Sequence, residues 1–279
     1  MNLKTTTQNI QTEYLDKNFI DWFVGFSEGD GSFGVNYYKN KGGVVGKSPR
    51  HDFIINQKDP QALYTIQSML GIGSVSKYQN TAQGTTYFRY IVSDLNGIAR
   101  LIQIFDGRLV LNKTKRRFHV WAETYRKRPG AVRHKACSSS VTNASGNAHN
   151  SAQPWGLDNA WLSGLIDAEG CFNVSDPEKS TALSLRFILD QKGEGEFLRT
   201  VVNIFQAGTI EQRRACADME RYVLCTSRTL TSTRNVAPAK KRAFDTLFAY
   251  LARYPLITAK RVASDKMEQL WRQHFSPDA

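Results

Sequence analysis

Two acidic residues, Asp30 and Glu169, each follow a short apolar stretch and each precede a glycine. The apolar residues before them recur at helical spacing, so both acids are predicted to stand at the C-terminal end of a helix. A carboxylate there is unfavourable, because the helix dipole places partial negative charge at the same end. Carboxylates and backbone carbonyls are the oxygen ligands that Mg²⁺ prefers. The pattern therefore indicates a divalent-cation site that relieves the repulsion between the two acids.

Small residues are spaced four apart along both predicted helices, with Gly25 and Gly29 in the first and Gly164 and Ala168 in the second. Each pair shares one helix face, and such faces let two helix backbones approach closely. We expect the helices to pack side by side around a pseudo-two-fold axis, with the carbonyls of Gly29 and Ala168 as further metal ligands. The alternative, that the acids are solvated turn residues, is weakened because the arrangement occurs twice in a basic protein.

The whole chain shows the same duplication. Four segments recur in the same order, at offsets of 132 to 147 residues: 23–33 with 162–172, 53–58 with 187–192, 89–92 with 221–224, and 109–113 with 256–260. Such ordered matches predict a tandem duplication fused into one chain. Residues 129–153 are rich in Ser, Asn, Ala and Gly, as is typical of a linker. We therefore divide the chain into a first repeat (1–128), the linker (129–153) and a second repeat (154–279).

Both repeats are predicted to contain the same order of elements, which places the protein in the α+β class. The first repeat should contain helix 14–28, strand 32–38, a strand ending at Gln57, a helix opened by Asp59 and Pro60 and running to about Leu70, strands 71–79 and 85–93, and helices 95–105 and 113–127. The expected fold is two pseudo-symmetric αββαββα repeats with the paired helices at their interface. Each antiparallel sheet should have helices behind it and a ligand in front.

Composition restricts the class of partner. The 279 residues carry 37 Lys and Arg against 25 Asp and Glu, a net charge of +12, which favours a polyanion. The first repeat alone has 18 bases and 10 acids, so the excess is not confined to a tail. The sequence contains no apolar run of about 18 residues and no secretory signal, so no membrane association is expected. Its four cysteines and five histidines are scattered, which argues against a disulfide framework or a zinc site.

Residues 23–31 and 162–170 resemble the motif of the LAGLIDADG homing endonucleases of the single-chain, two-repeat type. The second stretch is close to the motif, and the first departs from it at Ser27 and Glu28. The eighth motif position, here Asp30 and Glu169, carries the catalytic metal-binding acid in that family. The resemblance implies magnesium-dependent hydrolysis of duplex DNA, with Mn²⁺ substituting and Ca²⁺ binding without supporting cleavage. It also implies a staggered cut with 3′ overhangs in a non-palindromic target of roughly 20 bp.

The same resemblance implies roles for polar residues around the acids. A glutamine at the end of the second strand and a lysine just inside the last helix should lie near the scissile phosphates: Gln57 and Gln191, and Lys113 and Lys260. Strand-end capping and ordinary surface charge are the alternatives. Strand alternation nominates base-reading side chains on the groove-facing sides of the sheets: Ser32, Asn36, Tyr38, Arg50, Asn56, Ser76, Tyr78 and Arg89, then Asn173, Ser175, Arg186, Glu211, Arg213 and Arg221.

Two other functions remain open for a chain with this resemblance. One is an RNA maturase that assists splicing of its host intron, and the other is a catalytically silent DNA-binding regulator. The acids, glutamines and lysines are present in both repeats, which favours the nuclease because neither alternative needs them. Pairing of the repeats within one chain predicts a monomer with no obligate protein partner. The family usually occurs in organellar or archaeal introns, and by analogy the resemblance implies an intracellular and, more narrowly, a mitochondrial location.

Overall fold

The computed structural model describes residues 15–37, 48–80, 84–132, 155–175, 183–213, 216, 218–226 and 236–275. The first half contains α1 (Lys17–Asp30), β1 (Gly31–Asn36), β2 (Arg50–Gln57), α2 (Gln61–Leu70), β3 (Ser74–Asn80), β4 (Thr85–Val92), α3 (Leu95–Phe105) and α4 (Asn112–Arg126). The second half contains α5 (Trp161–Glu169), β5 (Gly170–Val174), β6 (Leu185–Lys192), α6 (Gly195–Phe205), β7 (Thr209–Gln212), β8 (Met219–Cys225), α7 (Pro238–Arg253) and α8 (Lys260–His274). The predicted order is confirmed, with two helices closing each half.

The boundaries differ from the prediction by only a few residues. Helix α1 continues to Asp30, and β1 ends at Asn36, two residues before the predicted end. Pro60 is the N-cap of α2 and not its first helical residue. The carboxylate of Asp59 nevertheless accepts a hydrogen bond from the backbone N–H of Gln61 at 3.1 Å, as a capping side chain does.

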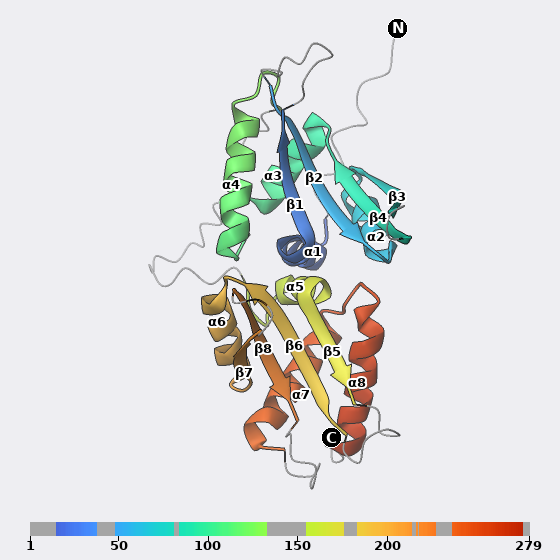
Figure 1. Cartoon of the computed structure of the whole chain (residues 1–279), viewed down its shortest axis with the longest axis vertical. Helices are drawn as coiled ribbons and strands as arrows, with labels where there is room; N and C mark the ends of the chain where they lie inside the picture. The colour runs from blue at the N-terminus through green and yellow to red at the C-terminus, as the bar shows by residue number, and fades with distance from the viewer. Residues whose placement is uncertain are drawn as a thin grey trace.

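Each half is built on a four-stranded antiparallel sheet, in the orders β1-β2-β4-β3 and β5-β6-β8-β7. The registers are equivalent, since Gly31 pairs with Ile55 and Gly170 with Leu189. Alternation along β2 buries Phe53 and Ile55 completely. The sheets therefore have one apolar face covered by helices and one polar face, as predicted. Figure 1 shows the halves end to end, with α1 and α5 between them.

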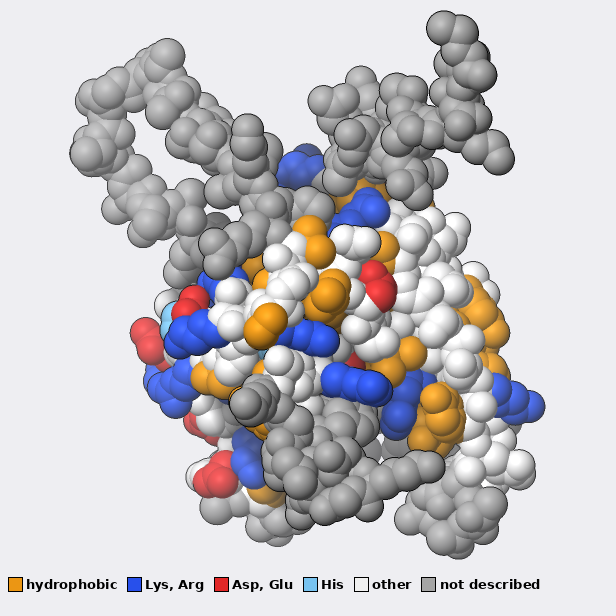
Figure 2. Space-filling view, turned by 90° about the horizontal axis from the view of Figure 1, so that it is seen from above, with side chains coloured by type: hydrophobic (Ala, Val, Ile, Leu, Met, Phe, Trp, Pro, Cys, Tyr) orange, Lys and Arg blue, Asp and Glu red, His pale blue; other side chains and the backbone are white. Residues whose placement is uncertain are grey.

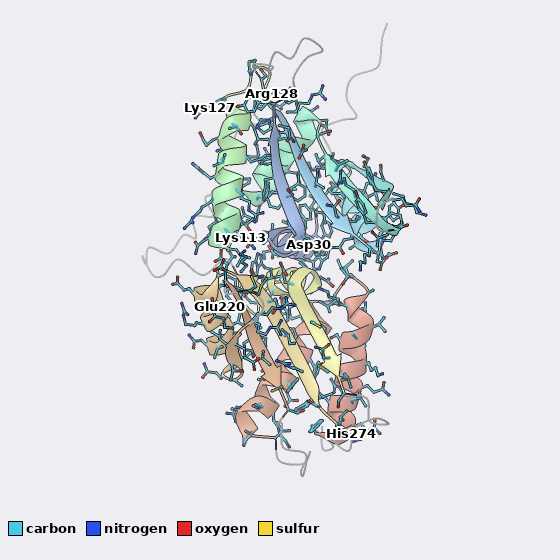
Figure 3. All side chains as sticks on the ribbon, viewed as in Figure 1. Asp30, Lys113, Lys127, Arg128, Glu220 and His274 are labelled. Carbon is cyan, nitrogen blue, oxygen red and sulfur yellow. The ribbon has the colours of Figure 1, made fainter. Side chains whose placement is uncertain are left out.

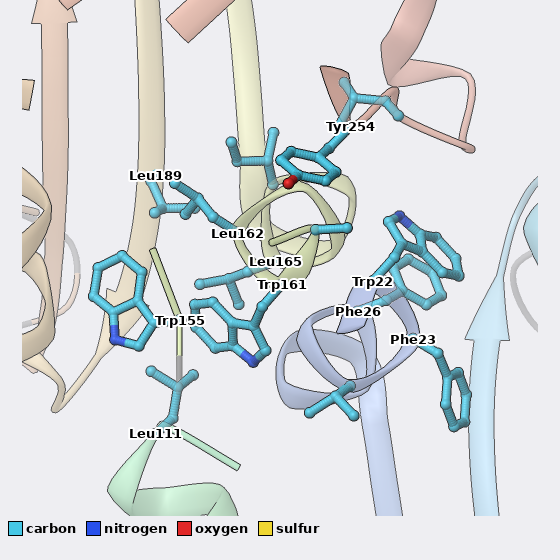
Figure 4. Close-up of a cluster of buried hydrophobic side chains, with 14 of the residues drawn as sticks. Trp22, Phe23, Phe26, Leu111, Trp155, Trp161, Leu162, Leu165, Leu189 and Tyr254 are labelled. Atoms are coloured by element: carbon cyan, nitrogen blue, oxygen red, sulfur yellow. The ribbon is translucent and has the colours of Figure 1, made fainter. Parts of the chain in front are cut away.

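The two central helices touch backbone to backbone. A Cβ on Gly25 would overlap the carbonyl of Trp161 and lie 3.0 Å from the Leu165 nitrogen. On the partner helix, a Cβ on Gly164 would lie 2.7 Å from the Phe26 nitrogen. The predicted close packing through small residues is therefore confirmed. Large buried side chains, including Trp161 and Phe26, surround the contact and join the cores of the two halves (Figure 4). No helix in the described ranges is long and apolar enough to cross a membrane.

Candidate active site at the ends of the paired helices

The close approach of α1 and α5 brings the two predicted catalytic acids together. A Cβ on Gly29, the residue before Asp30, would lie 2.9 Å from Cγ and 3.5 Å from Oε1 of Glu169. Burial and the charge of Glu169 raise the pKa of Asp30 to about 6. Burial also raises the pKa of Glu169, although Lys113 and Lys260 oppose this shift. Burial is the largest cause of both pKa shifts, so the site disfavours the charged form of each acid.

Asp30 lies in a pocket with polar side chains from both repeats. Gln57, the last residue of β2, donates from Nε2 to Oδ2 of Asp30 at 2.6 Å. The ammonium group of Lys260 donates to the carbonyl of Ala168 at 2.7 Å. Asp30, Gln57 and Lys260 line one open pocket of about 500 Å³. Burial lowers the pKa of Lys260, while the nearby charge of Asp30 opposes this. The first site thus contains an acid, an amide and an ammonium group around one cavity.

The surroundings of Glu169 are different. Lys113 lies near enough for its charge to lower the pKa of Glu169. Gln191 is only 1% exposed, and neither polar atom of its side chain has a hydrogen-bond partner in the part of the chain that the structure describes. The structure therefore does not join Gln191 to Glu169 by a hydrogen bond, whereas Gln57 is joined to Asp30.

Each lysine acts electrostatically on the acid of the opposite repeat. The charge of Lys260, at the start of α8, lowers the pKa of Asp30 and also that of Glu169. Lys113, in the first turn of α4, has the largest such effect on Glu169. Figure 3 shows Asp30 and Lys113 at the junction of the halves. Both pockets at the junction are consequently lined by residues from both repeats.

Sequence reasoning missed the role of Glu28. This side chain is 2% exposed and accepts hydrogen bonds from the backbone N–H groups of Val110 and, at 2.8 Å, Leu111. Burial raises its pKa to about 8, against the effect of these two donors. The bonded residues directly precede α4, so Glu28 anchors the turn from which Lys113 projects.

In the second repeat, Asp167 anchors the equivalent turn, which precedes α8. Its carboxylate accepts from the N–H groups of Ile257 at 2.7 Å and Thr258 at 3.2 Å, and Thr258 lies two residues before Lys260. It also accepts from the indole N–H of Trp22 on α1 at 2.8 Å, which ties the anchor to the helix pair. Residues 109–113 recur in the sequence as 256–260. This repetition was the signal that could have revealed the shared role of Glu28 and Asp167.

The donor chemistry at the helix ends fits a hard divalent cation. Two partly buried carboxylates meet there, and such oxygen ligands suit Mg²⁺, which keeps several of its own waters. The carbonyl of Ala168, predicted as a ligand, already accepts the bond from Lys260. No group of three or more His, Cys, Asp or Glu side chains with metal-binding geometry occurs within the described ranges. Asp30 and Glu169 are thus the side chains that would hold a metal, with water completing its coordination.

On the polar face of the first sheet, Arg89 is held in place by its neighbours. Its Nε donates to Oδ1 of Asn56 at 2.9 Å, and its guanidinium lies 4.8 Å from the ring centre of Tyr78. The rings of Tyr78 and Tyr87 are stacked at 5.5 Å. Ser76 pairs with Arg89 in the ladder and Asn36 pairs with Arg50, so these residues share the face. Tyr38 lies outside the described residues.

The second sheet carries two arginines in ion pairs on the equivalent face. Arg221 makes two hydrogen bonds to Asp190, at 2.9 and 3.0 Å, and Arg186 contacts Glu211 at 3.0 Å. Strand register places further nominated residues of both sheets on these faces or just beyond the strand ends: Ser32, Asn173, Ser175 and Arg213. The arrangement provides preorganised donors and acceptors on both sides of the acid pair.

Positive charge continues beyond the sheets. Lys127 and Arg128 lie at the C-terminal end of α4, at the outer end of the first half (Figure 3). Figure 2 shows that Lys and Arg side chains are distributed over this end of the molecule, with fewer acidic side chains among them. Such charge attracts phosphate groups irrespective of base sequence.

Comparison with known proteins identifies the family of the chain. The family model for LAGLIDADG endonucleases matches residues 23–125 and 162–270, which together make up most of both repeats. The chain belongs to the LAGLIDADG endonuclease family. Each matched segment begins at the first position of one motif, so the eighth positions are Asp30 and Glu169.

Curated relatives of this LAGLIDADG protein include products of fungal introns. It is 32% identical over 250 residues to "Probable intron-encoded endonuclease 4" of Neurospora crassa, covering 86% of this chain and 40% of the relative. It is 26% identical over 162 residues to "Probable intron-encoded endonuclease Cox1-I1b" of Schizosaccharomyces pombe, covering 56% of this chain and 41% of that protein. The chain thus spans about two-fifths of the length of these relatives.

Solved structures share the whole two-repeat LAGLIDADG fold. The homing endonuclease I-LtrWI bound to target DNA superposes with a TM-score of 0.61 at 18% identity, over 92% of this chain and 91% of that chain. I-GzeII in complex with its DNA target gives a TM-score of 0.60 at 18% identity, over 91% and 90% of the two chains. These likenesses confirm the α+β fold of paired repeats.

Proposed function

We propose that this chain is a site-specific, magnesium-dependent DNA endonuclease that makes a staggered double-strand cut with 3′ overhangs. One observation carries the proposal: Asp30, Gln57 and Lys260 surround one pocket beside Glu169, at the junction between two polar sheet faces. Phosphodiester hydrolysis needs negative ligands for a metal and positive charge for the reacting phosphate, and this pocket supplies both.

Divalent cations bound by Asp30 and Glu169 would activate water and stabilise the leaving 3′ oxygen. The hydrogen bond from Gln57 orients the carboxylate of Asp30 before any ligand arrives. Lys260 and Lys113 supply positive charge for the pentacoordinate phosphate as it develops. Glu28 and Asp167 fix the turns that carry these lysines, so the lysines approach from defined directions. The acids, the glutamine and the lysines therefore each have a function that hydrolysis of a phosphodiester requires.

The target follows from the arrangement of the sheets. Two faces on opposite sides of the acid pair would each cover about one helical turn of DNA, ~10 bp, which gives a site of roughly 20 bp. Arginine donors suit guanine, and a glutamate acceptor suits cytosine N4. The two faces carry different side chains, so the target is not palindromic. The protein acts as a monomer on double-stranded DNA, because both sites lie within one chain.

The relatives encoded by introns support a role in intron homing. Two Schizosaccharomyces pombe relatives are named for cox1 introns, and these names support the proposal of a mitochondrial location. An RNA maturase is the alternative activity for an intron-encoded member of this family. A maturase would not have to cleave DNA with a divalent metal, so one cleavage experiment distinguishes the maturase from the endonuclease.

The test uses a plasmid library that carries a randomised segment of about 22 bp, incubated with the purified chain and Mg²⁺. We expect a small set of related sequences to be linearised, with 3′ overhangs, and no linear product in EDTA. The matched control is the Asp30→Asn, Glu169→Gln double variant, which keeps the shape of both side chains and loses their charge. A library without any Mg²⁺-dependent linear product, or full cleavage by the double variant, would overturn the proposal.

A further inference from the structure

We propose that Glu194, in the second repeat, is a positioning residue for Lys113 of the first repeat, and that DNA cleavage depends on the hydrogen bond between them. Oε1 of Glu194 accepts this bond from the backbone N–H of Lys113 at 2.7 Å. The inference rests on the proposed endonuclease function and adds to it a buried residue that acts through the lysine. Its carboxylate fixes the start of α4, from which the lysine side chain extends.

The start of α4 has no capping side chain of its own. The first N–H groups of a helix have no helical carbonyl to accept them, and a polar N-cap side chain usually takes that role. Leu111 is the N-cap of α4 and makes no side-chain capping bond, and the first turn contains no acidic residue. The amide of Lys113 therefore needs an acceptor from elsewhere in the fold, and Glu194 supplies it.

The second repeat meets the same need within its own turn. Because residues 109–113 recur as 256–260, the equivalent of Leu111 is Thr258. The hydroxyl oxygen of Thr258 accepts from the backbone N–H of Lys260 at 3.2 Å. The second lysine thus has a local acceptor that the leucine of the first repeat cannot provide.

The residue that corresponds to Glu194 is consistent with this comparison. The recurrence of 53–58 as 187–192 continues to Pro60 and Glu194, and each of these two residues is the N-cap of the next helix, α2 or α6. A proline side chain has no hydrogen-bond acceptor. Each repeat therefore presents an acceptor to the other only where the other repeat lacks one.

Burial and charge make the bond between the repeats effective. Glu194 is 4% exposed, so little water competes for its carboxylate. A carboxylate is a stronger acceptor of an amide N–H than a neutral group, and negative charge is favourable at the N-terminal end of a helix. Glu28 of α1 accepts from the preceding amides of Val110 and Leu111. The turn that leads to Lys113 is thus held from both halves of the molecule.

Glu194 links Lys113 to the half that contains the acid on which this lysine acts. The charge of Lys113 lowers the pKa of Glu169, which ends α5 of the second repeat. Figure 1 shows the start of α4 at the junction of the halves, next to α6. A displacement of about 1 Å at reacting groups lowers a rate by about 100-fold, so the position of this helix start matters for cleavage. The hydrogen bond to Glu194 therefore sets the distance of the lysine from its site.

The first test is single-turnover cleavage of a site recovered from the plasmid library, with DNA affinity measured separately by gel shift in Ca²⁺. Glu194→Ala should slow cleavage by at least ~10-fold and leave DNA affinity unchanged, because the side chain is buried. Glu194→Gln keeps an oxygen acceptor and should cleave within ~3-fold of the wild-type rate. Cleavage by Glu194→Ala at the wild-type rate, or an equal loss in both variants, would overturn the inference.

A second test transfers the local acceptor of the second repeat to the first. Leu111→Thr introduces a hydroxyl at the position equivalent to Thr258 and is the reference for the combined variant. Adding Glu194→Ala should slow cleavage by at least ~10-fold in the wild-type background and by less than ~2-fold in the Leu111→Thr background. An equal loss in both backgrounds would show that Glu194 only supports the fold.

The Lys113→Met background makes the same comparison without a change in the core. Glu194→Ala should cause no further loss of cleavage there, because the ammonium group that it positions is already absent. A further loss of ~10-fold would contradict a role through the lysine.

Hydrogen exchange supplies a readout that needs no cleavage. Measured by NMR on the free protein, the amide of Lys113 should exchange at least ~10-fold faster in Glu194→Ala than in the wild type, while the amide of Lys260 should be unchanged. An unchanged exchange rate at Lys113 would overturn the inference. Faster exchange at Lys113 in a protein whose wild type cleaves no DNA would support the anchoring and contradict only the proposed endonuclease function.

Discussion

Replacing Gly25 by alanine should force the two central helices apart. The added Cβ would overlap the carbonyl oxygen of Trp161 and lie 2.9 Å from its carbonyl carbon and 3.0 Å from the nitrogen of Leu165. Non-bonded carbon atoms pack at about 3.5–4.0 Å, so α1 and α5 must separate by roughly 1 Å. The clashing atoms belong to the backbone and cannot rotate away. Overpacking of this kind costs ~1–3 kcal/mol.

The helix propensity of alanine offsets at most about 1 kcal/mol of that cost. We therefore expect Gly25→Ala to lower the free energy of unfolding by ~2 kcal/mol, an overpacking cost near the upper end of its range less that offset. The effect on catalysis should be larger. Asp30 and Glu169 end these same helices, and a displacement of about 1 Å at reacting groups lowers a rate by about 100-fold.

Urea unfolding measures the first effect as a shift in midpoint without a change in slope, and single-turnover cleavage measures the second. Ser27→Ala is the matched control on α1, because its buried hydroxyl has no hydrogen-bond partner in the described chain. Its removal should leave stability equal or higher and cleavage unchanged. The close-packing explanation is refuted if Gly25→Ala unfolds within ~0.5 kcal/mol of the wild type and cleaves at the same rate.

Three further outcomes follow from the charged groups. Asp30→Asn or Glu169→Gln should slow cleavage by orders of magnitude while DNA affinity, measured by gel shift in Ca²⁺, survives; a gel shift lost in both would contradict a purely catalytic role. Burial and the charge of Glu169 raise the pKa of Asp30 from 3.8 to about 6, so protons should compete with Mn²⁺ and binding should weaken as the pH falls through 6. Since the folded-state pKa lies above the unfolded one, the metal-free protein should lose stability as the pH rises through this interval, and urea midpoints of Asp30→Asn should not show that loss. Arg221→Ala should relax preference at one or two bases by ~1–3 kcal/mol, whereas Lys115→Ala should weaken binding to all sequences alike and reduce its salt dependence, as library profiles and salt titrations would show.

Local and self-similar signals were sufficient to predict the fold. Helical apolar spacing before Asp30 and Glu169, and period-two alternation around Phe53, identify elements from neighbouring residues alone. Repetition of those signals in both halves predicted the duplication. Small residues four positions apart, Gly25 with Gly29 and Gly164 with Ala168, predicted the helix pair, because such a face lets two helix backbones approach closely. The acid pair followed directly from this packing.

Tertiary structure alone decided how the site is shared between the halves. The charge of Lys113 lowers the pKa of Glu169 and the charge of Lys260 lowers the pKa of Asp30, so each lysine acts on the acid of the other repeat, and Lys260 also acts on Glu169. The start of α4 also meets the second repeat, where the backbone N–H of Lys113 donates to Oε1 of Glu194 at 2.7 Å, and no local pattern encodes that contact.

The inequality of the two glutamines was equally invisible in the sequence. Gln57 and Gln191 occupy matching positions in nearly identical segments, so the duplication predicted matching roles. Their surroundings differ: Gln57 ends β2, pairs with Phe88 and donates to Asp30, whereas β6 continues one residue beyond Gln191, which pairs with Glu220. The length of a strand ladder depends on its partner strand as well as on its own residues. A repeated sequence can therefore specify one fold twice and still build two different sites.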